Sequence, residues 1–387
     1  MECYLDNAST TRALPEVCDL VRKVMVEDYG NPSSLHMKGV EGERYIRQAE
    51  ERICKTLKCA PKNIIFTSGG TESNNMALIG TAMANRRRGK HIVTTCFEHP
   101  SVHEPLLYLE NFGFEVSYLP VDDRGHISPE ILRETLREDT ILVSVMLVNN
   151  EIGAVLDVQT LSEVVREYNE QIVFHVDAIQ AYGKIKLQPR RLGIDLMSVS
   201  GHKIHGPKGV GFLYVGDRVK MHVFLHGGGQ QRGMRSGTEN VPGIAGLGLA
   251  AEKMCEDMNG HREHLYELKR HFLERVTEVD GAVVNACGID SLAETAPHIV
   301  SVSFAGVRSE VLLHALEEEE IYVSSGSACS SNHPGISGTL KAIGVPDKLL
   351  ESTLRFSFSM FTELAEIDFT IDCLKRLVPM LARYQRN

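Results

Sequence analysis

The run Asp195-Leu-Met-Ser-Val-Ser-Gly-His-Lys-Ile-His-Gly-Pro207 passes from an apolar segment into a polar turn that contains Lys203. Its first six residues predict a short buried strand, and the Gly, His and Pro residues after them predict a turn. A lysine amine is costly to bury at such a place unless it is used, and one use is a Schiff base with an aldehyde. A solvated lysine that merely ends the strand is the structural alternative, and it is the commoner case for a lysine taken alone.

A second apolar run, Gln171-Ile-Val-Phe-His-Val176, ends on Asp177, and Gln180 follows three residues later. A carboxylate at a strand end is what a pyridoxal phosphate site needs in order to keep the pyridine nitrogen protonated. Lys203 and Asp177 together therefore favour a pyridoxal phosphate site more strongly than either residue does alone.

Short apolar runs alternate with amphipathic stretches between about residues 60 and 216. We expect strands at 63–67, 91–95, 115–119, 140–148, 171–176, 195–200 and 209–215, with helices at 73–85, 102–111 and 161–169 among them. This alternation predicts an α/β fold in which a mainly parallel seven-stranded sheet is covered by helices on both faces. Ligands of such sheets bind at the C-terminal ends of the strands, where the polar motifs of this chain lie.

The pattern changes past about residue 258. A long charged helix is expected at 262–279, and strands at 298–304, 321–323 and 353–358. These elements predict a smaller second domain of α+β type.

Composition narrows the classes of protein that the chain can belong to. The 41 basic residues against 51 acidic ones argue against a protein that binds nucleic acid directly. No run approaches the roughly 18 apolar residues of a membrane span, and Met1-Glu-Cys-Tyr-Leu-Asp6 has no features of a secretory signal. Nine scattered cysteines without a CxxC pair fit a reducing compartment, so we expect a cytoplasmic protein that does not associate with membranes.

One cysteine differs from the others in its surroundings. Cys329 lies in Ser324-Ser-Gly-Ser-Ala-Cys-Ser-Ser331, a context that predicts an exposed loop. An exposed thiol is an oxidation liability unless its nucleophilicity is used, so a catalytic and an incidental Cys329 both stay open. Cys54 and Cys59 lie five residues apart on a predicted helix, so we expect them to face different directions and to form a poor metal pair. His202 and His205 lack further ligands at suitable spacing, and no metal site is expected.

Several polar motifs carry candidate binding residues. Ser68-Gly-Gly-Thr-Glu-Ser-Asn-Asn75 offers hydroxyls, glycines and a helix N-terminus to a phosphate, although a simple N-cap explains it equally well. Ser200 and His202 flank Lys203 and are further phosphate donors by position. The run Gly227–Thr238 is a glycine-dense loop with two arginines, suited either to the surface or to an anion at a subunit interface.

Two more residues follow or interrupt predicted strands. His99, after the strand at 91–95, could stack on a cofactor ring or move protons, but a His-Pro pair is also common in turns. Arg355 lies within the apolar run Leu354-Arg-Phe-Ser-Phe358. A buried arginine requires an anion, which can be a substrate carboxylate or a structural carboxylate.

The chain resembles the cysteine desulfurases of the NifS/IscS type, in the class V aminotransferase group, from end to end. The matching segments are Tyr4-Leu-Asp-Asn-Ala8, Gly30-Asn-Pro-Ser-Ser34, Thr67-Ser-Gly-Gly-Thr-Glu-Ser-Asn-Asn75, Glu98-His-Pro-Ser-Val102, Val148-Asn-Asn-Glu-Ile-Gly153, His175-Val-Asp-Ala-Ile-Gln180, Ser200-Gly-His-Lys203, Arg235-Ser-Gly-Thr-Glu-Asn240 and Ser325-Gly-Ser-Ala-Cys329.

The resemblance implies a fold-type I pyridoxal 5'-phosphate enzyme that is a homodimer. It implies a large cofactor-binding domain at 14–258 and a small α+β domain, made of 1–13 and 259–387, that carries the catalytic cysteine loop. It also assigns roles to individual residues: Lys203 as the Schiff-base lysine, Asp177 at the ring nitrogen, Gln180 at the phenolic oxygen, His99 as stacking acid and base, Thr71, Ser200 and His202 at the phosphate with Thr238 of the partner subunit, Asn150 facing cofactor and substrate, and Arg355 with Asn31 at the substrate carboxylate.

The implied reaction removes sulfur from L-cysteine. The Cys329 thiolate attacks the substrate sulfur, keeps it as a persulfide and leaves alanine. The persulfide then passes to an acceptor protein, either an iron–sulfur scaffold or a tRNA-thiolation enzyme.

Departures from the family pattern keep the acceptor open. Ser9 stands where alanine is usual, and Ser330-Ser-Asn-His-Pro-Gly-Ile-Ser337 and Ser359-Met360 differ from the housekeeping type, as does the short end at Gln385-Arg-Asn387. Another pyridoxal phosphate activity, such as a selenocysteine lyase or an aminotransferase, and a sulfur carrier without a cofactor are the remaining alternatives.

Overall fold

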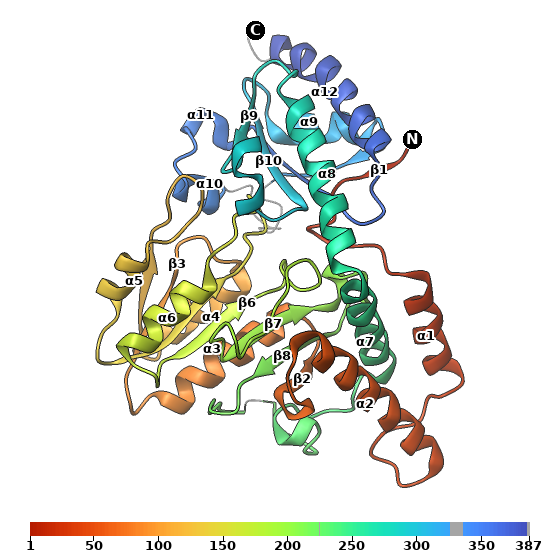
Figure 1. Ribbon diagram of the computed structural model, residues 1–387, viewed down its shortest axis with the longest axis vertical. Helices are drawn as coiled ribbons and strands as arrows, with labels where there is room; N and C mark the ends of the chain where they lie inside the picture. The colour runs from red at the N-terminus through yellow and green to blue at the C-terminus, as the bar shows by residue number, and fades with distance from the viewer. Residues whose placement is uncertain (224, 326–335, 385–387) are drawn as a thin grey trace.

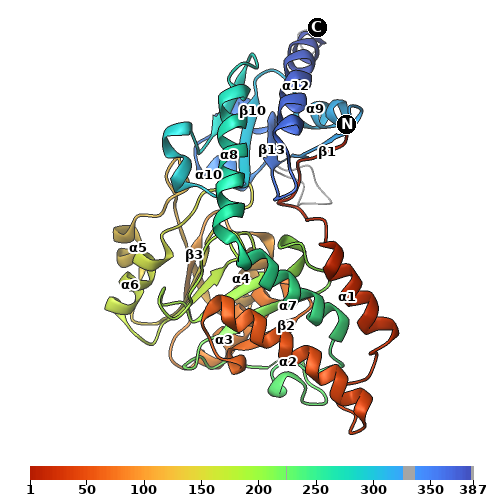
Figure 2. The ribbon, with the colours of Figure 1, turned by 45° about the vertical axis from the view of Figure 1, so that its right-hand side comes forward.

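The computed structural model describes residues 1–223, 225–325 and 336–384, which form two α/β layers joined by a long helix. The central sheet and its helices make the lower part of the molecule in Figure 1, and a smaller sheet makes the upper part. Helix α8 (Met258–Val276) runs from one part to the other, and α1 (Pro15–Val26) and α2 (Met37–Leu57) lie beside α7 (Val241–Glu256) in both views (Figures 1 and 2).

The central sheet has seven strands in the order β2-β8-β7-β6-β5-β3-β4. Only β8 runs antiparallel to its neighbours, so the prediction of a mainly parallel seven-stranded sheet is confirmed. The strands are β2 (Ile64–Thr67), β3 (His91–Thr95), β4 (Glu115–Leu119), β5 (Thr140–Met146), β6 (Val173–Asp177), β7 (Leu196–Ser200) and β8 (Gly211–Val215).

Side chains that alternate along the strands pack against helices on both faces of this sheet. Ile65 and Ile92 share a buried cluster with Ala77 and Leu106, which belong to α3 (Gly70–Asn85) and α4 (Pro100–Glu110). The neighbouring Phe66 belongs instead to the cluster that contains residues of α6 (Val158–Tyr168) and α7. Successive strand residues point to opposite faces, so this division shows that helices cover both sides.

The other helices are α5 (Pro129–Thr135), α9 (Ser309–Glu317), α10 (Gly338–Ala342), α11 (Asp347–Leu350) and α12 (Leu364–Tyr384). In the part of the chain that the structure describes, none of the helices has the length and apolar character needed to cross a lipid bilayer.

The upper part contains an antiparallel sheet in the order β12-β13-β10-β9 and a separate parallel pair, β1-β11. The strands are β9 (Ala282–Asn285), β10 (Ile299–Phe304), β12 (Ser324–Ser325), β13 (Thr353–Ser357), β1 (Cys3–Tyr4) and β11 (Ile321–Tyr322). Cys3 and Leu5 share a core with Leu268, Phe272 and Phe356, so the first residues pack with the last third of the chain. These contacts are compatible with the division at 13/14 and 258/259, which stays a prediction.

A buried carboxylate ties together three elements of the central sheet. Asp195, just before β7, accepts hydrogen bonds from Arg218 Nε (2.6 Å), Arg166 Nη2 (2.6 Å) and the Phe174 N–H (2.8 Å). Arg166 lies on α6, Phe174 on β6 and Arg218 just beyond β8. The carboxylate therefore fixes the packing of the sheet at the end opposite to the one where the polar motifs lie.

We expect Asp195→Ala to destabilise the fold by about 3–5 kcal/mol, because it leaves the partly buried Arg166 guanidinium uncompensated and the buried Phe174 N–H without its acceptor. Urea unfolding at neutral pH measures this change. The matched control is Glu167→Ala, which breaks the exposed Arg133–Glu167 pair (3.0 Å) and costs less than about 1 kcal/mol. Equal losses in the two variants would contradict the role of Asp195.

Candidate active site

A cavity of about 340 Å³ lies where strands of the central sheet end and the second sheet begins. Its walls contain nine of the residues that the sequence singles out: Thr71, His99, Asn150, Asp177, Gln180, Ser200, His202, Lys203 and Arg355. Eight of these come from the segments that follow or end β2, β3, β5, β6 and β7, and Arg355 comes from β13. The parallel strands thus deliver side chains from distant parts of the sequence to one edge of the sheet.

Lys203 lies in the short 3₁₀ turn Gly201–Lys203 directly after β7. Its Nζ donates to the backbone carbonyls of Ala8 (2.5 Å) and Ser9 (2.6 Å). The same N-terminal segment is bound to the loop behind the lysine, since the Thr11 N–H donates to the His202 carbonyl (2.9 Å). The first residues of the chain therefore form part of the cavity wall around the amine.

Asp177, the last residue of β6, is a buried carboxylate that also lines the cavity. Its Oδ2 accepts from Asn74 Nδ2 (2.8 Å) and its Oδ1 from the Ile179 N–H (3.0 Å). Burial raises the pKa of Asp177, although these hydrogen bonds and the positive charge of Lys203 work against the rise. A buried carboxylate with a raised pKa is stabilised by a cationic partner, which is what a protonated pyridine nitrogen provides.

His99 caps the N-terminus of α4. Its Nδ1 accepts from the Ser101 N–H (3.1 Å), which places the proton of the neutral ring on Nε2. Burial lowers the pKa of His99, with Asp177 acting against this change and Lys203 adding to it. The ring is therefore neutral at neutral pH and held in one tautomer.

Thr71 lies in the first turn of α3, Ser200 lies beside Gly69 and Gly70 at the start of that helix, and His202 lines the same cavity. The helix begins at Gly70, three residues earlier than expected, because Gly69 adopts a φ of 148° that only glycine accepts readily. A Cβ on Gly70 would lie 2.2 Å from Ile179 Cδ1, so a close approach of the backbone depends on this glycine too. Helix N–H groups and hydroxyls in such an arrangement suit a phosphate.

Two ionisable side chains beside these phosphate candidates have perturbed pKa values. The Glu72 carboxylate accepts from Arg235 Nε (2.7 Å) and the Ser68 N–H (2.7 Å). Burial alone would raise the pKa of Glu72, but these hydrogen bonds outweigh it and the pKa is lowered. Burial, and next the charge of Lys203, lowers the pKa of His202 to about 4, so the imidazole is neutral and can donate a hydrogen bond.

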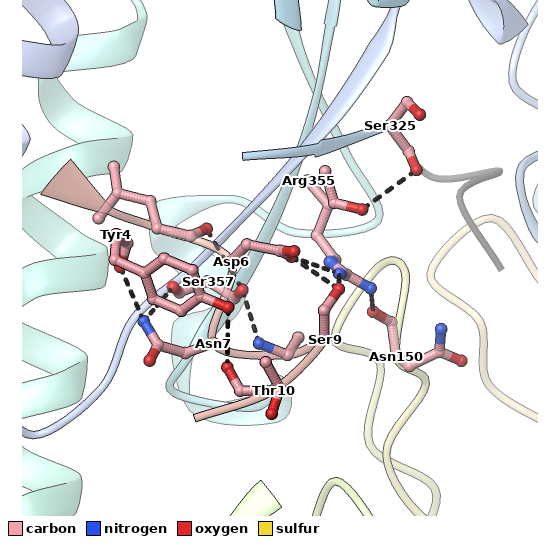
Figure 3. Close-up of polar contacts among 12 residues, drawn as sticks. Tyr4, Asp6, Asn7, Ser9, Thr10, Asn150, Ser325, Arg355 and Ser357 are labelled. Atoms are coloured by element: carbon pink, nitrogen blue, oxygen red, sulfur yellow. Dashed lines mark hydrogen bonds and ion pairs between the residues drawn. The ribbon is translucent and has the colours of Figure 1, made fainter. Parts of the chain in front are cut away.

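Arg355 is buried on β13, facing the cavity, and Figure 3 shows the groups around it. Nη2 donates to Asp6 Oδ1 (2.7 Å) and Ser9 Oγ (2.6 Å), and Nη1 donates to the Asn150 carbonyl (2.9 Å). Nε has no hydrogen-bond partner among the residues that the structure describes. The sequence left open whether Arg355 pairs with a structural or a substrate carboxylate. Arg355 has a structural carboxylate partner, Asp6, and it also borders the cavity.

Three predicted site residues are not among those that line the cavity. Asn31 is exposed between α1 and α2, where its Oδ1 accepts from the Ser33 N–H (2.9 Å), and Thr238 is exposed in the loop before α7. Cys329 lies outside the described residues. The roles of all three stay predictions. Within 1–223, 225–325 and 336–384, no group of three His, Cys, Asp or Glu side chains could hold a metal ion.

Sequence reasoning missed Asn74 and Glu98. Asn74 bridges Asp177 and Ser101 Oγ (2.9 Å), and nothing but its place in the motif after β2 could have indicated it. Glu98 precedes His99 and is partly buried: its Oε1 accepts from Thr95 Oγ1 (2.7 Å) and the Met146 N–H (2.8 Å), and its Oε2 is shielded from solvent. Burial raises the pKa of Glu98 to about 8, and the charge of Asp177 adds to the rise.

The raised pKa of Glu98 makes stability depend on pH in a defined direction. Its stabilising contribution is fully present below the ordinary pKa of 4.5 and is lost as pH rises towards about 8, because the unfolded chain releases its proton first. Relative to Glu98→Gln, the wild-type free energy of unfolding should fall by up to about 1.4 kcal/mol per pH unit in this window. Urea unfolding of both proteins at a series of pH values measures the difference, and a constant difference would contradict the prediction.

The residues around the cavity fit pyridoxal phosphate. A lysine amine, a buried carboxylate for the ring nitrogen and a helix N-terminus with hydroxyl donors for the phosphate share one cavity. Arg355 adds a guanidinium of the kind that binds an amino acid carboxylate.

Comparisons with known proteins agree with this chemistry. The family model described as Aminotransferase class-V matches residues 3–369. The chain is 43% identical to the cysteine desulfurase IscS of Dictyoglomus turgidum, over 98% of this chain and 95% of that protein. It is 40% identical to the IscS of Methanosarcina thermophila, over 98% and 92%.

Solved structures give the same result. A NifS-like protein superposes with a TM-score of 0.92 at 35% identity, covering 98% of this chain and 100% of the other. DndA from Streptomyces lividans has a TM-score of 0.76 at 37% identity, with 92% and 99% covered. The chain therefore belongs to the class-V aminotransferase family, in which it is a pyridoxal phosphate-dependent cysteine desulfurase.

Proposed function

We propose that Cys329 receives the sulfur of L-cysteine as a persulfide and passes it to an acceptor protein for iron–sulfur cluster assembly or tRNA thiolation. The observation that supports this role most directly is the pairing of β12 with β13. Ser324 pairs with Arg355, which borders the cavity, and Cys329 follows Ser324 by five residues. Five residues span at most about 18 Å, so the thiol is tethered within reach of the site.

The proposal assigns the cavity residues to the cofactor and the substrate. Lys203 holds the cofactor, Asp177 keeps its ring nitrogen protonated and Gln180 donates to its phenolic oxygen. Thr71, Ser200 and His202 hold the phosphate together with Thr238 of the partner subunit, and His99 stacks on the ring. Bound pyridoxal phosphate supplies an electron sink for negative charge at the substrate α-carbon. This assignment is supported by the nine predicted residues that line one cavity.

The remaining steps belong to the side chains of the chain itself. Arg355, Asn31 and Asn150 orient L-cysteine, and Lys203 and His99 move protons at the substrate. The Cys329 thiolate forms a bond to the substrate sulfur as the carbon–sulfur bond breaks, and the electron pair of that bond stays with the carbon. The carbon takes up a proton, alanine leaves, and the sulfur stays on Cys329 as a persulfide.

We also propose that the enzyme is a cytoplasmic homodimer. Large apolar side chains are exposed on the segment from the end of α1 to the start of α2: Met25, Val26, Tyr29, Leu35 and Met37. Asn31 lies in the same segment, and Thr238 is exposed elsewhere on the large layer. A partner subunit that covers the apolar segment would explain why an enzyme exposes these side chains.

Incubation with L-cysteine tests the role of Cys329 directly. We expect alanine and persulfide on Cys329 in equal initial amounts from the wild type, and neither from Cys329→Ser with its cofactor bound. Cys96→Ser removes an exposed thiol away from the cavity and should keep full activity. Alanine without persulfide on Cys329 would contradict the proposal.

The proton-transfer role of His99 gives a second prediction for the same assay. His99→Gln should lower kcat by about 10²–10⁴-fold.

Sedimentation velocity tests the dimer. We expect the double variant Leu35→Asp, Met37→Asp to sediment as a monomer, because two carboxylates would be buried in the interface. Val311→Asp, which changes an exposed apolar residue of α9, is the matched control and should stay dimeric. A wild-type protein that is monomeric at micromolar concentrations would contradict the interface.

A further inference from the structure

Two cysteines outside the cavity lie against each other at the end of α2. The helix ends at Leu57, and Lys58 adopts a left-handed conformation (φ 52°, ψ 48°). The N–H groups of Lys58 and Cys59 both donate to the Cys54 carbonyl, the latter at 3.2 Å. The expectation that the two cysteines face different directions is therefore wrong, because the helix ends before Cys59 and the chain turns back. A left-handed residue at a helix end brings a side chain of the last helical turn into contact with a side chain just beyond the helix.

The sulfur atoms are close and chemically unequal. Cys54 Sγ and Cys59 Sγ lie 3.6 Å apart, with Cys54 buried and Cys59 half-buried. The hydrogen bond between the two thiols lowers the pKa of the Cys59 thiol, the charge of Arg190 adds to this effect, and burial opposes it. The same hydrogen bond, followed by burial, raises the pKa of Cys54. This arrangement pairs an accessible nucleophile with a protonated thiol that is already in contact with it.

We propose that Cys54 and Cys59 form a second, redox-active dithiol site that closes reversibly to a disulfide with low-molecular-weight disulfides such as oxidised glutathione. The site goes beyond the proposed desulfurase function, because neither cysteine lines the cavity and the proposed sulfur transfer uses neither thiol.

The closing reaction is a pair of thiol–disulfide exchanges. The Cys59 thiolate attacks one sulfur of the small disulfide, forms a mixed disulfide and releases the other half as a thiolate, which takes a proton from water. Cys54 then loses its proton to water and attacks the Cys59 sulfur, releasing the second half as a thiolate, which takes a proton from water. Two electrons pass from the protein to the small disulfide, which becomes two thiols.

The local structure favours closure without unfolding. The sulfur atoms need to approach from 3.6 Å to the roughly 2 Å of a disulfide, and both residues belong to the same turn. The neighbouring Cys255 serves as an internal comparison, since burial raises the pKa of its thiol to about 11 and keeps it protonated. We therefore expect Cys255 to stay reduced under the same conditions.

The test uses the full-length enzyme with its cofactor, carrying Cys329→Ser so that the predicted catalytic thiol takes no part. After treatment with oxidised glutathione, free thiols are alkylated and the digest is examined by mass spectrometry. We expect a Cys54–Cys59 link with the loss of two hydrogen atoms, which dithiothreitol reverses. Adding Cys54→Ser should stop the reaction at a glutathione adduct on Cys59, and Cys255→Ser should leave the link unchanged.

Three results would overturn the proposal: no link between Cys54 and Cys59, a link from either residue to Cys255, or a stable glutathione adduct on Cys59 while Cys54 is present. With Cys329 intact, the variants Cys54→Ser and Cys59→Ser should keep wild-type release of alanine. This assay separates the two questions, because a failed desulfurase assay leaves the disulfide result unchanged.

Discussion

The ion pair between Arg355 and Asp6 is the interaction on which the arrangement of the cavity depends. A buried guanidinium is stable only with its charge compensated, and removing one partner of such a pair costs about 3–5 kcal/mol. Arg355, on β13, meets this requirement with groups from two other segments: Asp6 and Ser9 before α1, and the Asn150 carbonyl after β5. The same contacts that neutralise the charge therefore hold the walls of the cavity together (Figure 3).

Burial also selects which groups near the cavity carry charge. His99 and His202 are neutral because burial lowers their pKa values, so they act as hydrogen-bonding groups without repelling Lys203. Burial lowers the pKa of Lys184 to about 7, and its Nζ donates to the backbone carbonyl of Lys203 (2.9 Å). Asp177 and Arg355 bring opposite charges to the wall of the cavity, as the proposed binding of a pyridine nitrogen and a substrate carboxylate requires.

Much of the large layer could be predicted from the sequence because its strands are short, apolar and separated by amphipathic helices. The bounds of β3 and β4 agree with the predicted ranges. Strand β9 was missed because it has only four residues, of which two are partly buried and one is exposed, and β12 was missed because it has only two. Both depend on pairing with β10 or β13, which no local pattern encodes.

In the candidate site, too, some features could be predicted from local sequence and others could not. Residues at strand ends could be predicted, since the chemistry of Lys203, Asp177 and His99 stands out at positions where parallel sheets bind ligands. The contact of Lys203 with the Ala8 and Ser9 carbonyls could not be predicted, because backbone groups carry no sequence signal. Cys59 was misjudged because Lys58, rather than the usual glycine, ends α2 in the left-handed conformation.

The contact between Asp6 and Arg355 joins residues 349 positions apart. During synthesis on a ribosome Asp6 emerges long before Arg355, the arginine that neutralises it. The large sheet can form while the cavity still lacks one wall, because its strands all precede residue 216. Closing so long a loop costs little more entropy than closing a shorter one. The separation along the chain nevertheless means that the large sheet can form before the Asp6–Arg355 contact. Assembly of the catalytic centre is thus a late step of biosynthesis, and a nascent chain has no complete site until β13 has been translated.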